Sequence, residues 1–240
     1  MKVTNNTYVL SGSYFSGVND ISTLGEVYGI RTPGGVILVD CGESGHGPRM
    51  LRETLSYFNV TEPVTHVIIT HAHHDHCGGA KEIQSVGAKI IVAKEDAGRC
   101  ENGGVWGMYT PFDKGQAFSA FTPDIIINDD GELTINGLSF EFIKIPGHTK
   151  GSMAVRVNVD GKTVIFTGDA LQTDGKNNVG NITFGWQGDP DFSREDVVNS
   201  MMKLMKYETD MILPGHGKVC LRHGTAVLRH AAQTAFLTLR

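Results

Sequence analysis

Five short, largely apolar runs that lead into a histidine or an aspartate are the feature that most constrains how this chain can fold. The runs are VILV, VIIT, FIKI, VIFT and MILP, and the polar residues that follow them are Asp40, His71, His148, Asp169 and His216. Apolar runs of this length bounded by turn residues predict buried strands. Ligands of α/β proteins bind at the carboxyl ends of strands, so we expect these side chains to converge on one site.

Strand and helix patterns are mixed over the whole length, which predicts an α/β protein with helices packed on sheets. We expect a single domain over residues 1–240, because a chain of this length can bury one large core. The predicted strands are residues 7–12, 26–32, 35–40, 65–70, 88–93, 138–145, 152–159, 162–168 and 210–215. Helical apolar spacing covers residues 48–58, 77–86, 193–207 and 223–238, and Ser193 followed by Asp196 resembles a helix N-cap.

Composition argues against several classes of partner. The net charge is -5 and no basic patch is visible, so nucleic acid is not an expected partner. No apolar stretch reaches the roughly 18 residues that a membrane span needs, and the N-terminus lacks the pattern of a secretory signal. The four cysteines have no paired spacing, which predicts reduced thiols and a cytoplasmic location.

The stretch ITHAHHDHCGG, residues 69–79, is the strongest indication of chemistry. Side chains alternate in an extended segment, so His71 and His73 point to the same side and can chelate one ion. Asp75 and His76 follow as the chain turns into a helix and can face a second ion, whereas His74 is not expected to be a ligand. The alternative is a polar turn whose histidines are solvated, but the close spacing of these residue types favours metal binding.

The remaining strand exits supply the rest of a ligand set. His148 can complete a three-histidine set, the alternative being an ordinary loop histidine. Asp169 can bridge two cations, or it can be a helix N-cap. His216 can join Asp75 and His76, against the alternative of a simple Pro-Gly turn.

The order THAHHDHCGG, PGHTKGS, TGDAL and LPGHG resembles the metallo-β-lactamase superfamily, and within it the dinuclear hydrolases similar to glyoxalase II. The likeness runs from GGVILVDCG to PGHGK. It implies a four-layer αββα sandwich that carries two divalent metal ions, zinc first, with iron or manganese as alternatives. By this resemblance His71, His73 and His148 bind one ion, Asp75, His76 and His216 bind the other, and Asp169 bridges them. Asp40 is similar to a family aspartate near the cleft, which implies that it supports a metal-bound histidine rather than binding a metal, with turn formation as the alternative.

The resemblance also implies a reaction. A hydroxide held between two zinc ions attacks a carbonyl or phosphorus centre, and Asp75 orients it or passes a proton to the leaving group. The expected substrate is a small carboxyl derivative, namely a thioester, lactone or ester. The alternatives are an iron-dependent sulfur dioxygenase, a β-lactam or phosphodiester hydrolase of the same superfamily, and a metal-binding module without activity.

Differences between this sequence and particular branches of the superfamily limit the class of substrate that we expect. Glyoxalase II enzymes carry a helical C-terminal domain that holds glutathione, whereas only 24 residues follow His216 here. The chain resembles acyl-homoserine lactonases too, but they place a tyrosine where this chain has Gln172. The β-lactamases of the B3 type lack the bridging aspartate that Asp169 supplies. The sequence indicates neither the natural substrate nor the oligomeric state.

Aromatic residues predict an apolar wall near the site. The Gly-rich region 98–121 reads as a long loop that forms a lid or pocket wall, with packing in a core as the alternative. Its apolar side chains are Trp106, Met108, Tyr109, Phe112 and Phe118, and further wall candidates are Phe184, Trp186, Tyr14 and Phe15. We therefore expect a small-molecule substrate with an apolar part.

Overall fold

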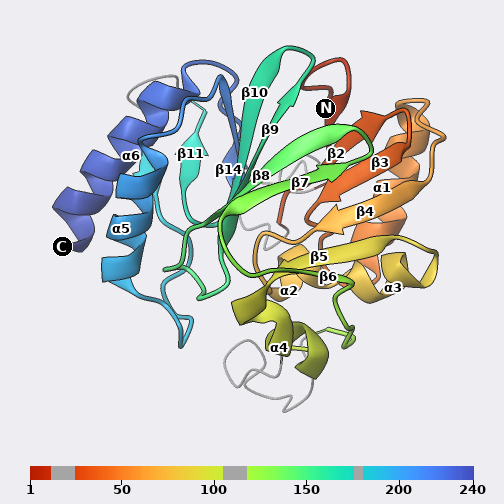
Figure 1. Ribbon diagram of the computed structural model, residues 1–240, viewed down its shortest axis with the longest axis horizontal. Coiled ribbons are helices and arrows are strands. Elements are labelled where there is room, and N and C mark those ends of the chain that lie inside the picture. The colour runs from red at the N-terminus through yellow and green to blue at the C-terminus, as the bar shows by residue number, and fades with distance from the viewer. Residues whose placement is uncertain (12–24, 105–117, 176–180) are drawn as a thin grey trace. The chain divides into compact units, whose positions relative to one another are not determined.

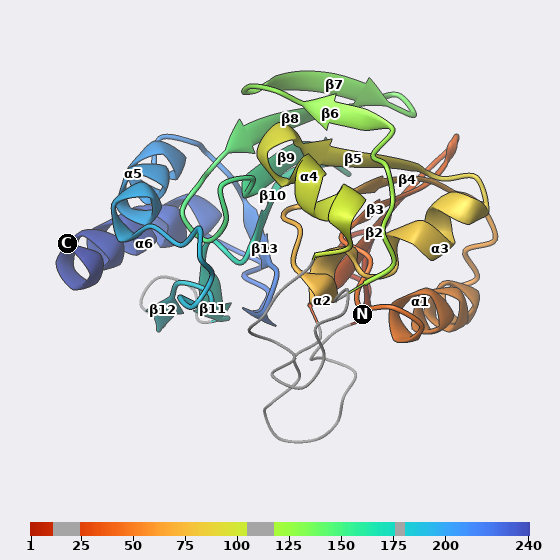
Figure 2. The same ribbon diagram turned by 90° about the horizontal axis from the view of Figure 1, so that it is seen from below.

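The structure is a computed structural model that describes residues 1–11, 25–104, 118–175 and 181–240. The chain forms two compact units, Met1–Asn128 and Asp129–Arg240, and Figures 1 and 2 show the elements of each. The expectation of a single domain over residues 1–240 stays a prediction.

The first unit is built on a six-stranded sheet in the order β1-β2-β3-β4-β5-β6. Its strands are β1 (Thr7–Ser11), β2 (Val27–Thr32), β3 (Gly35–Val39), β4 (Val64–Ile68), β5 (Lys89–Ala93) and β6 (Ile125–Ile127). The first three strands are antiparallel, whereas β3, β4, β5 and β6 are parallel neighbours. The carboxyl ends of these parallel strands therefore lie at one edge of the sheet.

The helices of the first unit are α1 (His46–Tyr57), α2 (His74–Cys77), α3 (Ala80–Ser85) and α4 (Lys94–Asn102). Figure 2 shows α1 and α3 on the same side of the sheet. Leu51 and Leu55 of α1 and Ile83 of α3 pack with alternate residues of the strands, such as Leu38 and Val67, in one buried core. Alternation along each strand brings these residues to one face, and the burial of that face stabilises the unit.

The second unit contains a five-stranded sheet in the order β13-β10-β9-β8-β7 and a small sheet in the order β12-β11-β14. The large sheet comprises β7 (Gly131–Ile135), β8 (Leu138–Lys144), β9 (Met153–Val159), β10 (Lys162–Gly168) and β13 (Met211–Pro214). The small one comprises β11 (Gln172–Asp174), β12 (Ile182–Thr183) and β14 (Gly217–Lys218). Strand β9 is antiparallel to both β8 and β10, and β13 is parallel to β10, so β8, β10 and β13 run in one direction.

Two helices cover one face of the large sheet in the second unit. They are α5 (Arg194–Leu204) and α6 (Gly224–Leu239), which lie side by side in Figure 1. Met201 of α5 and Leu228 of α6 pack with Ile143, Ile165 and Ile212 of the strands. Helix α5 begins where predicted, because the Ser193 hydroxyl accepts a hydrogen bond from the Asp196 backbone amide.

The structure confirms each predicted strand, and the predicted helices appear as α1, α5, α6 and the pair α2 and α3. One helical prediction needs correction: residues 77–86 are not one helix, because Gly78 and Gly79 separate α2 from α3. Among the described residues, the sequence patterns missed five short strands and α4. Strands of two to five residues with exposed or charged positions carry little apolar periodicity.

Region 98–121 is only partly a loop. Its first residues, through Asn102, belong to α4. Phe118 and Phe121 are buried in the core of the first unit, so packing rather than a lid describes these two side chains. The wall candidates Trp106, Met108, Tyr109, Phe112, Tyr14 and Phe15 lie outside the described residues.

Two further observations bear on the expectations from composition. No helix in the described part of the chain is long and apolar enough to cross a membrane.

The four cysteines, Cys41, Cys77, Cys100 and Cys220, are all buried free thiols. Burial is the largest cause that raises the pKa of each thiol, so each is held in its protonated form.

Candidate metal centre

The first unit places its predicted site residues where its parallel strands end. Asp40 directly follows β3, and His71 follows β4 after two further residues. The ladder continues past β4, since the Ile69 amide donates to the Ile91 carbonyl at 2.9 Å. His71, His73, Asp75 and His76 are all buried at this edge.

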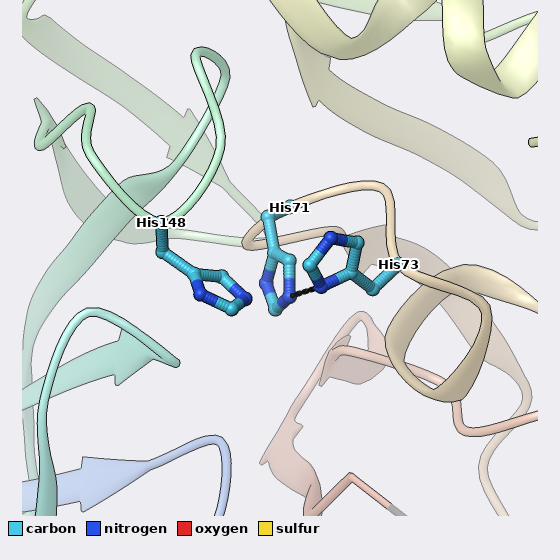
Figure 3. A group of neighbouring side chains, drawn as sticks. All are labelled: His71, His73 and His148. Atoms are coloured by element: carbon cyan, nitrogen blue, oxygen red, sulfur yellow. Dashed lines mark hydrogen bonds between the residues drawn. The ribbon is translucent and has the colours of Figure 1, made fainter. Parts of the chain in front are cut away.

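Ligand-type atoms of these residues lie close together. His71 Nε2 and His73 Nδ1 are 3.1 Å apart, which Figure 3 shows as a dashed line between the two rings. His76 Nε2 is 3.4 Å from Asp75 Oδ2. The rings of His71 and His76 have centroids 4.2 Å apart. The HAHHDH segment thus folds so that its two predicted chelating pairs are neighbours.

The carboxylate of Asp40 connects two of these histidines. Its Oδ1 accepts a hydrogen bond from the Thr70 amide at 2.7 Å, and its Oδ2 accepts one from the Thr70 hydroxyl at 2.8 Å. The same Oδ2 lies 2.8 Å from His76 Nδ1. The predicted role of Asp40 beside a histidine agrees with this contact. Thr70 was not recognised in the sequence, because its bond to Asp40 spans 30 residues.

These contacts also determine which nitrogen of each ring remains for a metal. When the Asp40 carboxylate accepts from His76, the His76 proton is on Nδ1 and the lone pair is on Nε2. The single proton of the Thr70 hydroxyl goes to Asp40, so the Thr70 oxygen accepts from His71 Nδ1 at 3.1 Å. His71 therefore also presents the lone pair of Nε2.

Burial is the largest influence on the pKa of Asp40 and raises it, whereas His76 and the hydrogen bonds from Thr70 lower it. The opposing contributions have one physical reason. A carboxylate removed from water is unfavourable unless hydrogen-bond donors surround it. Here those donors are Thr70 and His76, so the same contacts that stabilise the charge also hold these two residues in place.

The second unit places its three predicted site residues at the ends of β8, β10 and β13, which run in one direction. His148, drawn in Figure 3, lies in the turn after β8. Asp169 directly follows β10, and His216 follows β13 after Gly215, whose amide donates to the Gly168 carbonyl at 2.8 Å. These exits therefore meet at one edge of the sheet.

Asp169 lies between the two histidines of this unit. Its Oδ2 is 3.6 Å from His148 Nε2 and 3.5 Å from His216 Nε2. Asp169 and His148 are buried, and the His216 side chain is 18% exposed. One carboxylate oxygen that faces two imidazole nitrogens is the arrangement expected of a carboxylate that bridges two ions.

The spacings fit metal ligation. Two ligand atoms on a tetrahedral ion with zinc–ligand bonds of about 2.0 to 2.1 Å are about 3.3 Å apart. The four close pairs within the two units range from 3.1 to 3.6 Å. Nitrogen and carboxylate donors at this spacing suit a divalent cation, and each unit supplies several of them.

Two glycines that sequence reasoning missed lie against two of the histidines that are predicted ligands. A Cβ atom at Gly25 would be 2.8 Å from Cε1 of His76, and a Cβ at Gly185 would be 2.9 Å from Nδ1 of His148. The Gly185 amide also donates to the Asp169 carbonyl at 2.9 Å. A side chain at either position would displace an imidazole, so both backbones pack directly on the site.

The described wall candidates near Gly185 differ in environment. Phe184 is partly buried and packs against the core of the second unit, so it agrees with the packing alternative. Trp186 is 40% exposed.

Gln172 is the residue that distinguishes this chain from the lactonases in the sequence analysis. Its side-chain oxygen accepts a hydrogen bond from the Thr183 hydroxyl within the small sheet.

Sequence comparison identifies the class of protein. The family model of the metallo-beta-lactamase superfamily matches residues 24–216. The chain belongs to this superfamily, and the match confirms the resemblance seen in its motifs.

Particular relatives narrow the likeness. A protein named hydroxyacylglutathione hydrolase from Shewanella pealeana is 31% identical over 65% of this chain and 46% of its own length. Hydroxyacylglutathione hydrolase GloC from Haemophilus influenzae is 32% identical over 63% of this chain and 68% of its own length. The chain thus spans about half the length of the Shewanella protein.

A solved structure supports the fold. A beta-lactamase from Chitinophaga pinensis superposes with a TM-score of 0.75 at 17% identity, covering 99% of this chain and 91% of its own. This confirms the predicted metallo-β-lactamase fold of the α/β class.

Replacement of Asp40 tests how much its hydrogen bonds contribute. Asp40→Ala leaves buried donors of Thr70 and His76 without their acceptor, and we expect it to lower the free energy of unfolding by about 3 kcal/mol. The measurement is denaturant unfolding of the metal-free protein. Asp40 also has a φ of 58°, a left-handed conformation that is itself unfavourable for alanine.

Asp160→Ala is the matched control, because Asp160 is an exposed residue with a φ of 55°. It shares the backbone conformation of Asp40 without its buried position, and we expect a loss of about 1 kcal/mol. Equal losses in the two variants would show that the hydrogen bonds of Asp40 contribute nothing beyond the backbone effect.

Gly185→Ala tests the close approach of this backbone to His148. The added methyl would lie 2.6 Å from the Asp169 carbonyl oxygen, so we expect a destabilisation of about 1 to 3 kcal/mol. Gly131→Ala is the control in the same unit, because a Cβ there meets nothing within 4 Å. Unfolding curves should separate the two variants, and a Gly185→Ala protein as stable as the control would contradict the packing described.

Proposed function

We propose that this protein is a metal-dependent hydrolase that holds two divalent ions. One ion is bound by His71, His73 and His148, the other by Asp75, His76 and His216, and Asp169 bridges the two. The observation that carries the proposal is the position of Asp169 Oδ2, 3.6 Å from Nε2 of His148 and 3.5 Å from Nε2 of His216. A carboxylate that serves two ions needs a histidine of each ion beside it.

The donor set favours zinc. Imidazole nitrogens and carboxylate oxygens are common zinc ligands, and iron or manganese accept the same donors. The lone pairs on Nε2 of His71 and His76, which their Nδ1 contacts determine, support ligation by these two nitrogens.

Two bound cations would supply a hydroxide nucleophile near neutral pH and would stabilise negative charge on the substrate. The chain itself contributes the placement of the proton-carrying groups. Asp75 is buried in the first turn of α2 with its Oδ2 toward His76, and we assign it to orienting the nucleophile or passing a proton to the leaving group. The four cysteines are buried, which argues against a thiolate nucleophile.

A thioester is the first substrate class that we propose, ahead of lactones and other esters. Two of the relatives described above carry the name hydroxyacylglutathione hydrolase. A hydroxyacylglutathione is a thioester. The exposed Trp186 supports a substrate with an apolar part.

The proposals for binding partners and for location in the cell rest on the amino-acid sequence. We propose a small-molecule substrate and a cytoplasmic protein with reduced thiols, in agreement with the four buried free cysteines. The absence of nucleic-acid and membrane partners stays a prediction from charge and hydropathy.

A hydrolysis panel tests the substrate class. Zinc-loaded protein should hydrolyse acyl thioesters faster than lactones, β-lactams or phosphodiesters, measured as kcat/KM for each. A hydroxyacyl thioester of glutathione and the same acyl group on a shorter thiol separate recognition of the acyl group from recognition of glutathione. Oxygen consumption with a persulfide by iron-loaded protein, without thioester hydrolysis, would instead support the sulfur dioxygenase.

Substitution of ligands tests the metal centre. His73→Ala and Asp169→Ala should each abolish turnover and lower the bound metal per chain while the circular dichroism spectrum is retained, because each removes a ligand. His74→Ala is the control within the same run of histidines and should keep both metal and turnover. Full activity in either ligand variant would refute the assignment of that residue.

A further inference from the structure

Asp96 is a buried carboxylate beside the histidine segment that the proposed reaction does not use. It is fully buried, and its Oδ2 accepts a hydrogen bond of 2.7 Å from the backbone amide of Ala72. Ala72 is the residue between His71 and His73, and its own side chain is buried in the core of the first unit.

The topology of the first unit brings these two segments together. Strands β4 and β5 are parallel neighbours, so the histidine segment after β4 and the start of α4 after β5 lie at one edge of the sheet. Asp96 is the third residue of α4. An acidic residue at this position commonly bonds back to its own helix start, and this one accepts a hydrogen bond from the neighbouring segment.

Two carboxylates therefore hold alternate amides of one segment. Asp40 accepts from the amide of Thr70, and Asp96 accepts from the amide of Ala72. The residue between these two amides is His71, and His73 follows the second. Fixing both amides restricts the backbone dihedral angles that determine where the two imidazoles point.

We propose that Asp96 is a positioning residue, which holds the backbone between His71 and His73 so that their nitrogens are spaced for one metal ion. The inference rests on the proposed function, because it assigns those two histidines to a metal. The 3.1 Å between His71 Nε2 and His73 Nδ1 is the spacing that the Asp96 contact maintains. A buried negative charge beside the segment also favours a cation there.

A purely structural role for Asp96 gives a different expectation. Acidic residues in the first turn stabilise a helix through its dipole, and Glu95 occupies the same turn of α4 but is exposed. Glu95→Gln therefore removes a charge from the helix start without touching Ala72. It is the matched control for Asp96→Asn and Asp96→Ala.

The first measurement uses the metal-free protein. Amide hydrogen exchange at Ala72, followed by NMR, should be about tenfold or more faster in Asp96→Ala than in the wild type, because the acceptor is lost. Exchange in Glu95→Gln should match the wild type. Unchanged exchange at Ala72 in Asp96→Ala would overturn the proposal.

The second measurement is affinity for Zn²⁺ in competition with a chromophoric chelator, together with the absorption spectrum of the Co²⁺-loaded protein. Loss of a supporting contact to a metal-binding segment lowers metal affinity by about 10- to 100-fold. We expect this loss in Asp96→Ala with an altered Co²⁺ spectrum, a smaller loss in Asp96→Asn, and none in Glu95→Gln. If Asp96→Ala does not fold, Asp96→Asn decides, and wild-type affinity in that variant overturns the proposal.

The outcomes separate this inference from the proposed function. Wild-type protein that binds no Zn²⁺ would overturn both. Wild-type protein that binds Zn²⁺, with His73→Ala impaired and Asp96→Ala unimpaired, would overturn the role of Asp96 alone.

Discussion

The hydrogen bonds of the buried Asp40 carboxylate are the interaction on which the candidate metal-binding residues of the first unit depend. This carboxylate receives the amide and hydroxyl of Thr70 and contacts Nδ1 of His76, and through the Thr70 hydroxyl it also determines the proton position on His71. Burial is unfavourable for the charge, so the carboxylate keeps these donors in place. One side chain thereby orients two imidazoles through contacts at their Nδ1 atoms.

Parallel strands explain why residues far apart in the chain become neighbours. Asp40, the histidine segment and Asp96 follow β3, β4 and β5, while His148, Asp169 and His216 follow β8, β10 and β13. Strands that run in one direction deliver their carboxyl ends to one edge, and each unit uses this rule once. Backbone that approaches closely, as at Gly25 beside His76 and at Gly185 beside His148, also restricts these two rings.

The sequence patterns found most of the fold and every proposed ligand, because buried strands are apolar and chelating residues are closely spaced. They failed for α4, a polar helix whose last residues fall within the region 98–121 that the sequence predicts as a loop. They also failed for Asp96 and Gly185, which look like ordinary helix and loop residues until a distant segment packs on them. Short-range patterns carry no information about such contacts.

Local sequence by itself determined the strands, the chelating HAHHDH spacing and the superfamily, because alternation and ligand type are properties of neighbouring residues. Only the tertiary structure decided which nitrogen His71 and His76 present and which carboxylates hold the segment between strand and helix. Those properties depend on hydrogen bonds between residues 24 to 36 positions apart, and folding alone brings such groups within 3 Å.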